Sequence, residues 1–488
     1  MIEKVTAANV GKIANPAFRE YAQRYVDIEE GFREAVETFG VPFAVASGED
    51  DSESEGGNEG EGVERGSNQV NDRAAEPPAE CKANQISDRT ADQPADRAAC
   101  ISDLADRGLR VLNDGKSLVV GWQSSACEAC RLGLQTETFV MTLACPRRCF
   151  FCFNPNQVDF DGRIAGPRDA VAQLEARAAS GAKLCHVALT GGEPLLFPRE
   201  TVAFFQRARE LFSGVHTRLY TSGSGLDEVL LEKLRDAGLL EIRFSIKTDE
   251  GTEDMKRTLD LIASAVGVIP DVMVEMPVMP GEVDLMKDLL VRLDTLGVRG
   301  INLLELGFPL FNGEEFARRG YRLKAEPYRV LYDYAYAAGL PVAGSEEACL
   351  ELLKFVQDEG LSLGVHYCSM ENKHTGQVFQ QNAPHAKDFS LHSMSKRDHF
   401  LKSGKAFGPD RATVREVLFQ ENVPFEESDD FNYVEFPVTA VSLLRDKLPD
   451  FELAISYAIC EDRDGETVLR ELRIDRTTPA AFDFERDW

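Results

Sequence analysis

The sequence lacks an uninterrupted apolar segment long enough to span a bilayer. Its most apolar long stretch, residues 261–280, contains Asp271, Glu275 and three prolines, and its first thirty residues contain no apolar core of a signal peptide. Basic residues are also scarce, because 54 Lys and Arg stand against 82 Asp and Glu, for a formal net charge of -28. A phosphate-neutralising surface is therefore not expected. We expect a soluble, cytoplasmic protein with neither a membrane nor nucleic acid as partner.

A disulfide framework is also not expected in a cytoplasmic protein. The chain has 11 cysteines in 488 residues, and cytosolic thiols are kept reduced. Metal binding is the better explanation for cysteines that lie close together. The length and the 43% hydrophobic content predict two to four structural units.

The N-terminal 107 residues divide into two segments. Residues 1–45 contain apolar residues at helical spacing between Pro16 and Gly40, which predicts a helix. Residues 46–107 are rich in Asp, Glu, Gly and Ser, so they lack the apolar surface that would offset the entropy of ordering. We expect a disordered acidic linker, in which Cys81 and Cys100 are incidental thiols.

The remaining chain alternates between strand and helix patterns. Residues 108–134 predict a β-hairpin around Asn113-Asp114-Gly115, followed by a CxxC motif. Residues 135–335 predict six βα units with strands at 138–144, 184–190, 218–222, 241–247, 271–278 and 301–307. The fold class is therefore α/β, a partial (βα)6 TIM-type barrel. Residues 336–400 could extend it toward (βα)8 with strands at 340–344 and 361–368, and residues 401–488 predict a C-terminal α/β module.

The segment TLACPRRCFFCFN, residues 142–154, places Cys145, Cys149 and Cys152 in a CxxxCxxC pattern directly after the first predicted strand. In a βα barrel the C-terminal ends of the strands carry the chemistry. Cysteine thiolates hold iron-sulfur clusters, and three of them would leave one iron of a cubane open. The alternatives are a zinc knuckle and a structural cluster whose fourth ligand lies elsewhere.

Three later strand ends also carry distinctive residues. The second strand ends in LTGGEP, with Gly191, Gly192 and Glu193, which could equally be an ordinary glycine turn. The third ends in YTSG. The fourth reads FSIKTDE, and its Ser245 and Lys247 can donate hydrogen bonds to an anionic ligand or can simply be solvated.

Together these motifs resemble the radical SAM superfamily, in particular its activating enzymes related to glycyl-radical and pyruvate formate-lyase systems, over about residues 135–335. The resemblance implies that the three cysteines hold a 4Fe-4S cluster whose open iron binds S-adenosylmethionine (SAM). It implies cofactor-binding roles for Phe151, Gly191, Gly192, Glu193, Ser245 and Lys247, and a segment near adenine at Pro277 to Gly281.

The resemblance also implies the reaction. A reduced cluster would cleave SAM to a 5'-deoxyadenosyl radical, which abstracts hydrogen from a peptide, a protein or a small metabolite. An electron donor such as flavodoxin or ferredoxin would be needed. Phe150, Phe151 and Phe153 suit apolar shielding of the cluster. The competing hypothesis is an electron-transfer or metal-sensing protein whose cluster has four protein ligands and which performs no SAM chemistry.

A second metal site is a further hypothesis. Cys127 and Cys130 form a CxxC motif, and two ligands alone are not a site. Cys368 is the best third ligand, with His366 or His374 to complete the set. Barrel closure would place Cys368 beside the first strand, whereas the CxxC would start near the opposite face. Cys185, Cys349 and Cys460 are expected in the core, and residues 371–382 are expected to form a polar loop.

Overall fold

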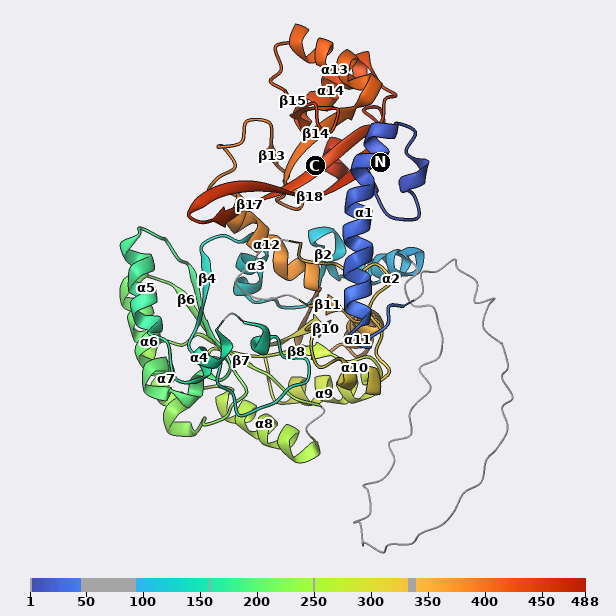
Figure 1. Cartoon of the computed structure of the whole chain (residues 1–488). Coiled ribbons are helices and arrows are strands. Elements are labelled where there is room, and N and C mark those ends of the chain that lie inside the picture. The colour runs from blue at the N-terminus through green and yellow to red at the C-terminus, as the bar shows by residue number, and fades with distance from the viewer. Residues whose placement is uncertain (1, 45–93, 158, 249–250, 332–338) are drawn as a thin grey trace, which may run out of the picture.

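The protein is described by a computed structural model over residues 2–44, 94–157, 159–248, 251–331 and 339–488. Among these residues the strands form two large sheets, each with its own helices (Figure 1). The predicted linker residues 46–93, with Cys81, lie outside the described residues. None of the described helices is both long and apolar enough to cross a membrane.

The larger sheet carries the predicted βα units. Within the described chain its order is β2-β3-β12-β9-β8-β7-β6-β5-β4, and the strands β4 to β9 and β12 are parallel. Its strands are β2 (Arg110–Leu112), β3 (Ser117–Val120), β4 (Thr136–Val140), β5 (His186–Thr190), β6 (His216–Thr221), β7 (Glu241–Phe244), β8 (Asp271–Val278), β9 (Gly300–Glu305) and β12 (Gly364–Cys368). The six predicted strands of these units are therefore present.

Helices cover the outer face of this sheet (Figure 1). They are α5 (Ala170–Ala179), α6 (Pro198–Leu211), α7 (Glu228–Ala237), α8 (Thr252–Ala265), α9 (Val283–Thr295) and α11 (Ser345–Glu359). Alternate strand residues such as Leu189, Leu219, Ile242 and Val274 pack beneath them in the main hydrophobic core. Burial of these apolar side chains stabilises the sheet and fixes its register.

The inner face, opposite those helices, is polar. Because side chains alternate along a strand, Arg218, Arg243, Glu275 and Asn302 project from the side opposite their buried apolar neighbours. Their parent strands β6, β7, β8 and β9 are adjacent in the sheet. Each of these strands has a polar residue between apolar ones, so the polar face is visible in the sequence as an alternation.

The extension of the barrel differs from the prediction in two ways. Residues 340–344 do not supply a seventh strand, because β11 (Leu340–Pro341) pairs antiparallel with β10 (Gly307–Phe308) in a separate two-stranded sheet. The eighth predicted strand is present as β12 and lies parallel beside β9. Its other neighbour is β3 of the hairpin, so the expected closure of β12 against the first strand is wrong.

Helix α3 (Ser125–Leu132) carries the CxxC motif, and helix α12 (Met370–Asn382) replaces the polar loop expected at residues 371–382. The two helices lie side by side (Figure 1). Their backbones meet at two glycines, since a Cβ on Gly376 would lie 2.0 Å from the Cys130 carbonyl oxygen and one on Gly133 would lie 2.3 Å from that of Gly376. Glycine at both positions lets α3 and α12 pack closely.

The N-terminal helix α1 (Pro16–Glu37) matches its prediction and begins with Asn15, whose side chain accepts from Ala17 and Phe18 backbone N–H groups. The linker prediction was wrong at its C-terminal end. Helix α2 (Pro94–Asp106) occupies residues assigned to the linker, and it buries Leu104 in the main core.

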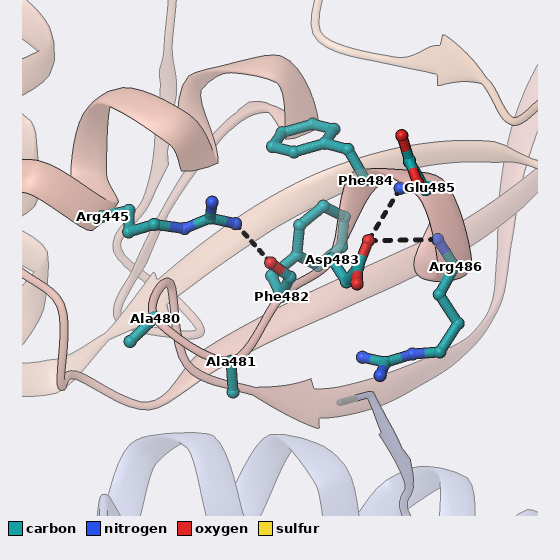
Figure 2. Close-up of a pocket in the computed structure, with 8 residues that line it drawn as sticks. All are labelled: Arg445, Ala480, Ala481, Phe482, Asp483, Phe484, Glu485 and Arg486. Carbon is teal, nitrogen blue, oxygen red and sulfur yellow. Dashed lines mark hydrogen bonds between the residues drawn. The ribbon is translucent and has the colours of Figure 1, made fainter.

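The second sheet is antiparallel and belongs mainly to the C-terminal part of the chain. Its strands are β1 (Glu3–Lys4), β13 (Ser393–Met394), β14 (Leu401–Phe407), β15 (Glu426–Ser428), β16 (Tyr433–Pro437), β17 (Leu453–Arg463) and β18 (Glu466–Thr477). Helices α13 (Gly408–Gln420) and α14 (Val441–Lys447) pack with it. Near its end, α15 (Phe484–Asp487) lines a surface pocket, where Arg445 donates to the Phe482 carbonyl and Asp483 caps the helix (Figure 2).

Candidate functional site

The three clustered cysteines lie in the loop that follows β4, at the C-terminal edge of the parallel strands. Cys145 is exposed, whereas Cys149 and Cys152 are half-buried, and none of them is in a disulfide. A turn closes the loop, because the Cys152 backbone N–H donates to the Cys149 carbonyl at 3.1 Å. Three thiols are therefore presented together at the edge where βα proteins carry their chemistry.

The glycine pair after β5 is bonded to the chain that leads into this loop. Gly192 N donates to Thr142 O at 2.7 Å, and Glu193 N donates to Ala144 O at 2.8 Å. A Cβ at Gly191 or Gly192 would lie 2.1 Å from the Thr142 or the Ala144 carbonyl oxygen, respectively. Glycine is required here by the chain's own backbone, and this contact fixes the start of the cysteine loop.

Glu193 is fully buried, and its carboxylate is occupied by groups of the chain. It accepts hydrogen bonds from Thr221 Oγ1 at 2.7 Å, from Ser222 N at 2.7 Å and Oγ at 2.6 Å, and from Leu195 N at 3.0 Å. Burial raises the pKa of this carboxyl, and the four donors act in the opposite direction. The GGE and YTSG motifs are thus tied together, and the carboxylate of Glu193 is not free to meet a ligand.

Ser245, Lys247 and Phe151 come together beside the cysteine loop. Lys247 is 7% exposed, donates to Ser245 Oγ at 2.8 Å, and lies 4.9 Å from the centre of the Phe151 ring. Burial raises the pKa of the Cys152 thiol, and the positive charge of Lys247 partly offsets that effect. The residues predicted from three separate strand ends and the cysteine loop therefore share one location.

An apolar cluster supports the loop from behind. Phe150 is buried and packs against Phe151, Phe316 and Tyr321, with ring centres 5.1, 5.0 and 6.4 Å away. Asn312 Nδ2 donates to the Phe150 carbonyl at 3.1 Å. These contacts anchor the loop on the protein and shield one side of it from water.

The cysteine loop fits a cluster better than a single metal ion. Zinc holds its thiolates at about 2.3 Å each, so its sulfurs lie within a few ångströms of one another. Within the described residues, the only three His, Cys, Asp or Glu ligand atoms found within 4.8 Å of one another belong to His216, Glu241 and Asp271. A cubane places each thiolate on a different iron, which suits three sulfurs that are near but not touching.

The CxxC motif lies on the inner face of the sheet, away from the loop that follows β4. Cys127 Sγ accepts from Arg243 Nη2 at 3.2 Å and from Asn302 Nδ2 at 3.4 Å. Cys368, at the end of β12, is buried and accepts from Asn372 Nδ2 at 3.2 Å. Burial raises the pKa of Cys368 to about 12, and the charges of Cys127 and Cys130 act on it too. Cys127 and Cys368 therefore face one polar region, and Cys130 lies one helical turn from Cys127 on α3.

Sequence reasoning missed the charged residues of this inner face. Arg243 is 2% exposed and bridges Glu241 at 2.5 Å and Glu275 at 2.6 Å. Glu241 also accepts from Ser124 Oγ and lies 3.0 Å from His216 Nε2. The nearby positive charges hold the pKa values of both carboxyls below the usual range.

The remaining predicted residues lie elsewhere. His366 is not free to ligate a metal, because its ring nitrogens lie 2.9 Å from Ser117 Oγ and 3.0 Å from Asn302 Oδ1. His374 Nδ1 lies 2.8 Å from the Met370 carbonyl oxygen. Cys349 and Cys460 are buried as expected, but Cys185 is exposed, which corrects its assignment to the core.

Comparison with known proteins agrees with these motifs. The family model of the Radical SAM superfamily matches residues 139–293. A putative glycyl-radical enzyme activating enzyme, MJ0021 of Methanocaldococcus jannaschii, is 27% identical over 317 residues, which cover 62% of this chain and 79% of that protein. The PqqA peptide cyclase of Methylorubrum populi is 36% identical over 117 residues, 24% of this chain and 28% of that protein.

The chain thus spans less than a third of the length of that peptide cyclase. Among solved structures, Streptococcus suis SuiB bound to S-adenosylmethionine is 12% identical with a TM-score of 0.34, over 48% of this chain and 50% of that chain.

The family match identifies residues 139–293 as a Radical SAM domain, and the relatives are named as enzymes. This match supports an enzyme that would use a 4Fe-4S cluster and SAM and would cleave SAM reductively to a 5'-deoxyadenosyl radical. An electron-transfer or metal-sensing protein without SAM chemistry is not favoured.

Proposed function

We propose that Cys145, Cys149 and Cys152 hold the catalytic cluster. The observation that carries this proposal is the pair of hydrogen bonds joining the glycine segment to Thr142 and Ala144, directly before Cys145. That contact leaves three thiols of one short loop at the C-terminal edge of the parallel strands. Residues 135–335 would then form the catalytic core, with the hairpin, the N-terminal helices and the C-terminal module around it.

The cofactor nucleotide would lie across the neighbouring strand ends. The backbone at Gly191, Gly192 and Glu193 would receive the methionine amino group. Ser245 and Lys247 would donate to the ribose and the carboxylate, because they already share a hydrogen bond and Lys247 is a buried cation. The Phe151 ring, held 4.9 Å from Lys247, would cover the cluster side of the site.

The chain's own contribution is to bind, orient and exclude water, since the cofactors supply the bond cleavage. Thr221 and Ser222 fix Glu193 and with it the glycine segment. Phe150 and its aromatic neighbours hold the cysteine loop in place. A site built on strand ends rather than on free loops keeps the reacting groups in a fixed geometry.

We propose a peptide or protein as the substrate. Support comes from the names of relatives, an activating enzyme for a glycyl-radical enzyme and a peptide cyclase, both of which denote action on polypeptides. An external low-potential donor such as flavodoxin or ferredoxin would reduce the cluster, which suits the reducing cytoplasm. A small metabolite is the competing substrate.

The test is anaerobic reconstitution with iron and sulfide, followed by reduction in the presence of SAM. We expect 5'-deoxyadenosine to form in the wild-type protein, with either dithionite or reduced flavodoxin as donor. Cys149→Ala should abolish it, and the matched variant Cys185→Ser, at an exposed cysteine outside the loop, should leave it unchanged. Product formation by Cys149→Ala at the wild-type rate would refute the assignment of the loop.

The substrate class is tested separately. SAM turnover should transfer deuterium into 5'-deoxyadenosine from a labelled peptide or partner protein encoded near this chain. Transfer only from labelled small metabolites would reject the polypeptide and favour the metabolite.

A further inference from the structure

The geometry points to a second iron-sulfur cluster on the inner face of the sheet, held by Cys127 and Cys130 of α3 and by Cys368 at the end of β12. This site uses none of the residues assigned to SAM chemistry. It stands whether or not the proposed substrate is right.

The fold brings the three cysteines together from distant parts of the chain. Cys127 and Cys130 are one helical turn apart and so share a face of α3. Helix α3 is pressed against α12 by the contact between Gly133 and Gly376, and α12 begins two residues after Cys368. Cys127 contacts Arg243 and Asn302, which mark the inner face. Each thiol is thus delivered to the same side of the sheet.

Two of the three sulfurs accept hydrogen bonds from side chains, which suits thiolates bound to iron. As thiols they also donate, Cys127 to Asn302 Oδ1 at 3.7 Å and Cys368 to the Ser369 carbonyl at 3.8 Å. Arg243 and Asn302 donate to Cys127, and Asn372 donates to Cys368. A thiol buried only for packing needs no such donors, since it behaves as a small apolar group. Donors aimed at cysteine sulfur tune iron-sulfur clusters and orient their ligands.

The side chain of Arg218 independently indicates that this region binds an anion. Its side chain belongs to a residue that is 4% exposed, and its Nε is buried without a hydrogen-bond partner. Within the described chain its guanidinium makes no direct ion pair, although it interacts at longer range with the carboxylates of Glu241 and Glu275. It lies 5.1 Å from the centre of the Tyr220 ring. Among the charged groups that act on the Cys130 thiol, Arg218 has the largest effect. A buried, unpaired guanidinium is costly unless a negative group completes the site.

The charges around the three sulfurs favour a thiolate cluster. The positive charges of Arg218 and Arg243 act on Cys130, and that of Lys373 acts on Cys368. The negative charge of Glu275 also acts on Cys130, and Glu241 is paired with Arg243. These groups leave about one positive charge in excess, and an oxidised cubane with three thiolates carries about one negative charge.

A single zinc ion does not fit this arrangement. No ligand-atom group that includes Cys127, Cys130 or Cys368 is compact enough for one ion within the described residues. Sulfurs that face one region at wider spacing suit separate corners of a cluster. Cys130 is exposed although charges of the inner face surround it, so its sulfur is accessible to incoming iron.

The experiment measures iron and sulfide in the full chain after anaerobic reconstitution. In a variant with Cys145, Cys149 and Cys152 all changed to Ala, we expect about four iron and four sulfide per chain to remain, together with a cluster signal by electron paramagnetic resonance after reduction. Adding Cys130→Ser to that variant should remove at least half of the remaining iron. The matched addition of Cys185→Ser, also at an exposed cysteine, should remove none.

Three outcomes would overturn the proposal. They are loss of all iron in the triple variant, retention of iron after Cys130→Ser and Cys127→Ser are both added, and binding of one zinc in place of iron. Circular dichroism of the single Cys130→Ser variant distinguishes loss of the site from loss of the fold. If wild-type protein forms no 5'-deoxyadenosine while the triple variant keeps its iron, the function proposed above fails and this site survives.

Discussion

At the level of single residues, the GGE motif at Gly191, Gly192 and Glu193 connects the segment after β5 to the start of the cysteine loop. Gly191 and Gly192 admit the carbonyl oxygens of Thr142 and Ala144, and Glu193 is saturated by donors from Thr221, Ser222 and Leu195. The motif therefore positions the cysteine loop before any ligand binds. Its identity was predictable from sequence, but its partners were not, because spacing along a chain does not reveal which backbone atoms lie across a sheet.

The change Gly192→Ala tests this joint. A Cβ there would lie 2.1 Å from the Ala144 carbonyl oxygen, so the backbone before Cys145 must move. We expect a loss of about 1–3 kcal/mol in the free energy of unfolding, typical of overpacking, and less than half of the wild-type iron in the site that follows β4. Denaturant titration and iron analysis measure both quantities.

The matched control is Gly166→Ala, because a Cβ at Gly166 meets nothing within 4 Å. It should leave stability and iron content as in the wild type. Equal effects of the two substitutions would show that the contact with Ala144 does not position the loop.

At the scale of elements, sequence reasoning succeeded where apolar periodicity meets a hydrophobic core. Strands β4 to β9 and helix α1 were predicted because their buried faces are apolar. It failed for α12, whose buried residues include Asn372, His374 and Thr375. A helix that packs over a polar sheet face has no apolar stripe, so its sequence reads as a loop. For the same reason, Arg243 and Asn302, the polar partners of Cys127 on this face, could not be predicted from the apolar pattern.

The imidazole of His374 should make stability depend on pH. Burial lowers its pKa to about 4, below the 6.5 of the free side chain. Between these two pKa values the unfolded chain binds a proton at His374 that the folded chain does not bind. The free energy of unfolding is therefore highest above pH 6.5 and falls as the pH drops toward 4. We expect His374→Gln to reduce the loss of unfolding free energy between pH 7 and pH 5 by about 2 kcal/mol.

Denaturant titrations at the two pH values give the measurement. His385→Gln is the control, because His385 lies near the end of the same segment and is 39% exposed. An unchanged pH dependence in His374→Gln would mean that the buried imidazole is not the group that titrates.

At the scale of the whole molecule, helix α1 ties the two sheets together. Phe18 is fully buried and stacks on Phe407 of β14 with ring centres 5.1 Å apart. Val36, near the other end of the helix, packs in the cluster that contains Phe308 and Leu323 beside the cysteine loop. Figure 1 shows the helix running between the two parts. The sequence predicted the helix but not this role, because an apolar stripe does not identify its partner.

The substitution Phe18→Ala should therefore weaken the C-terminal sheet. Removing a fully buried phenylalanine costs about 3–5 kcal/mol. We expect the fluorescence of Trp488, which packs against Phe484, to change at lower denaturant than in the wild type. Ile28→Ala on the same helix is the control, because Ile28 is 60% exposed and its loss should cost little. Identical transitions for the two variants would contradict a tethering role for Phe18.

We propose that three cysteines of one loop hold a cluster and leave one of its irons open for SAM. The most direct measurement is electron paramagnetic resonance of the reduced protein in which Cys127, Cys130 and Cys368 are changed to Ser, so that only the cluster of the Cys145 loop can contribute. We predict a 4Fe-4S signal that shifts when SAM is added. A signal unmoved by saturating SAM, or no cluster at all, would contradict the account.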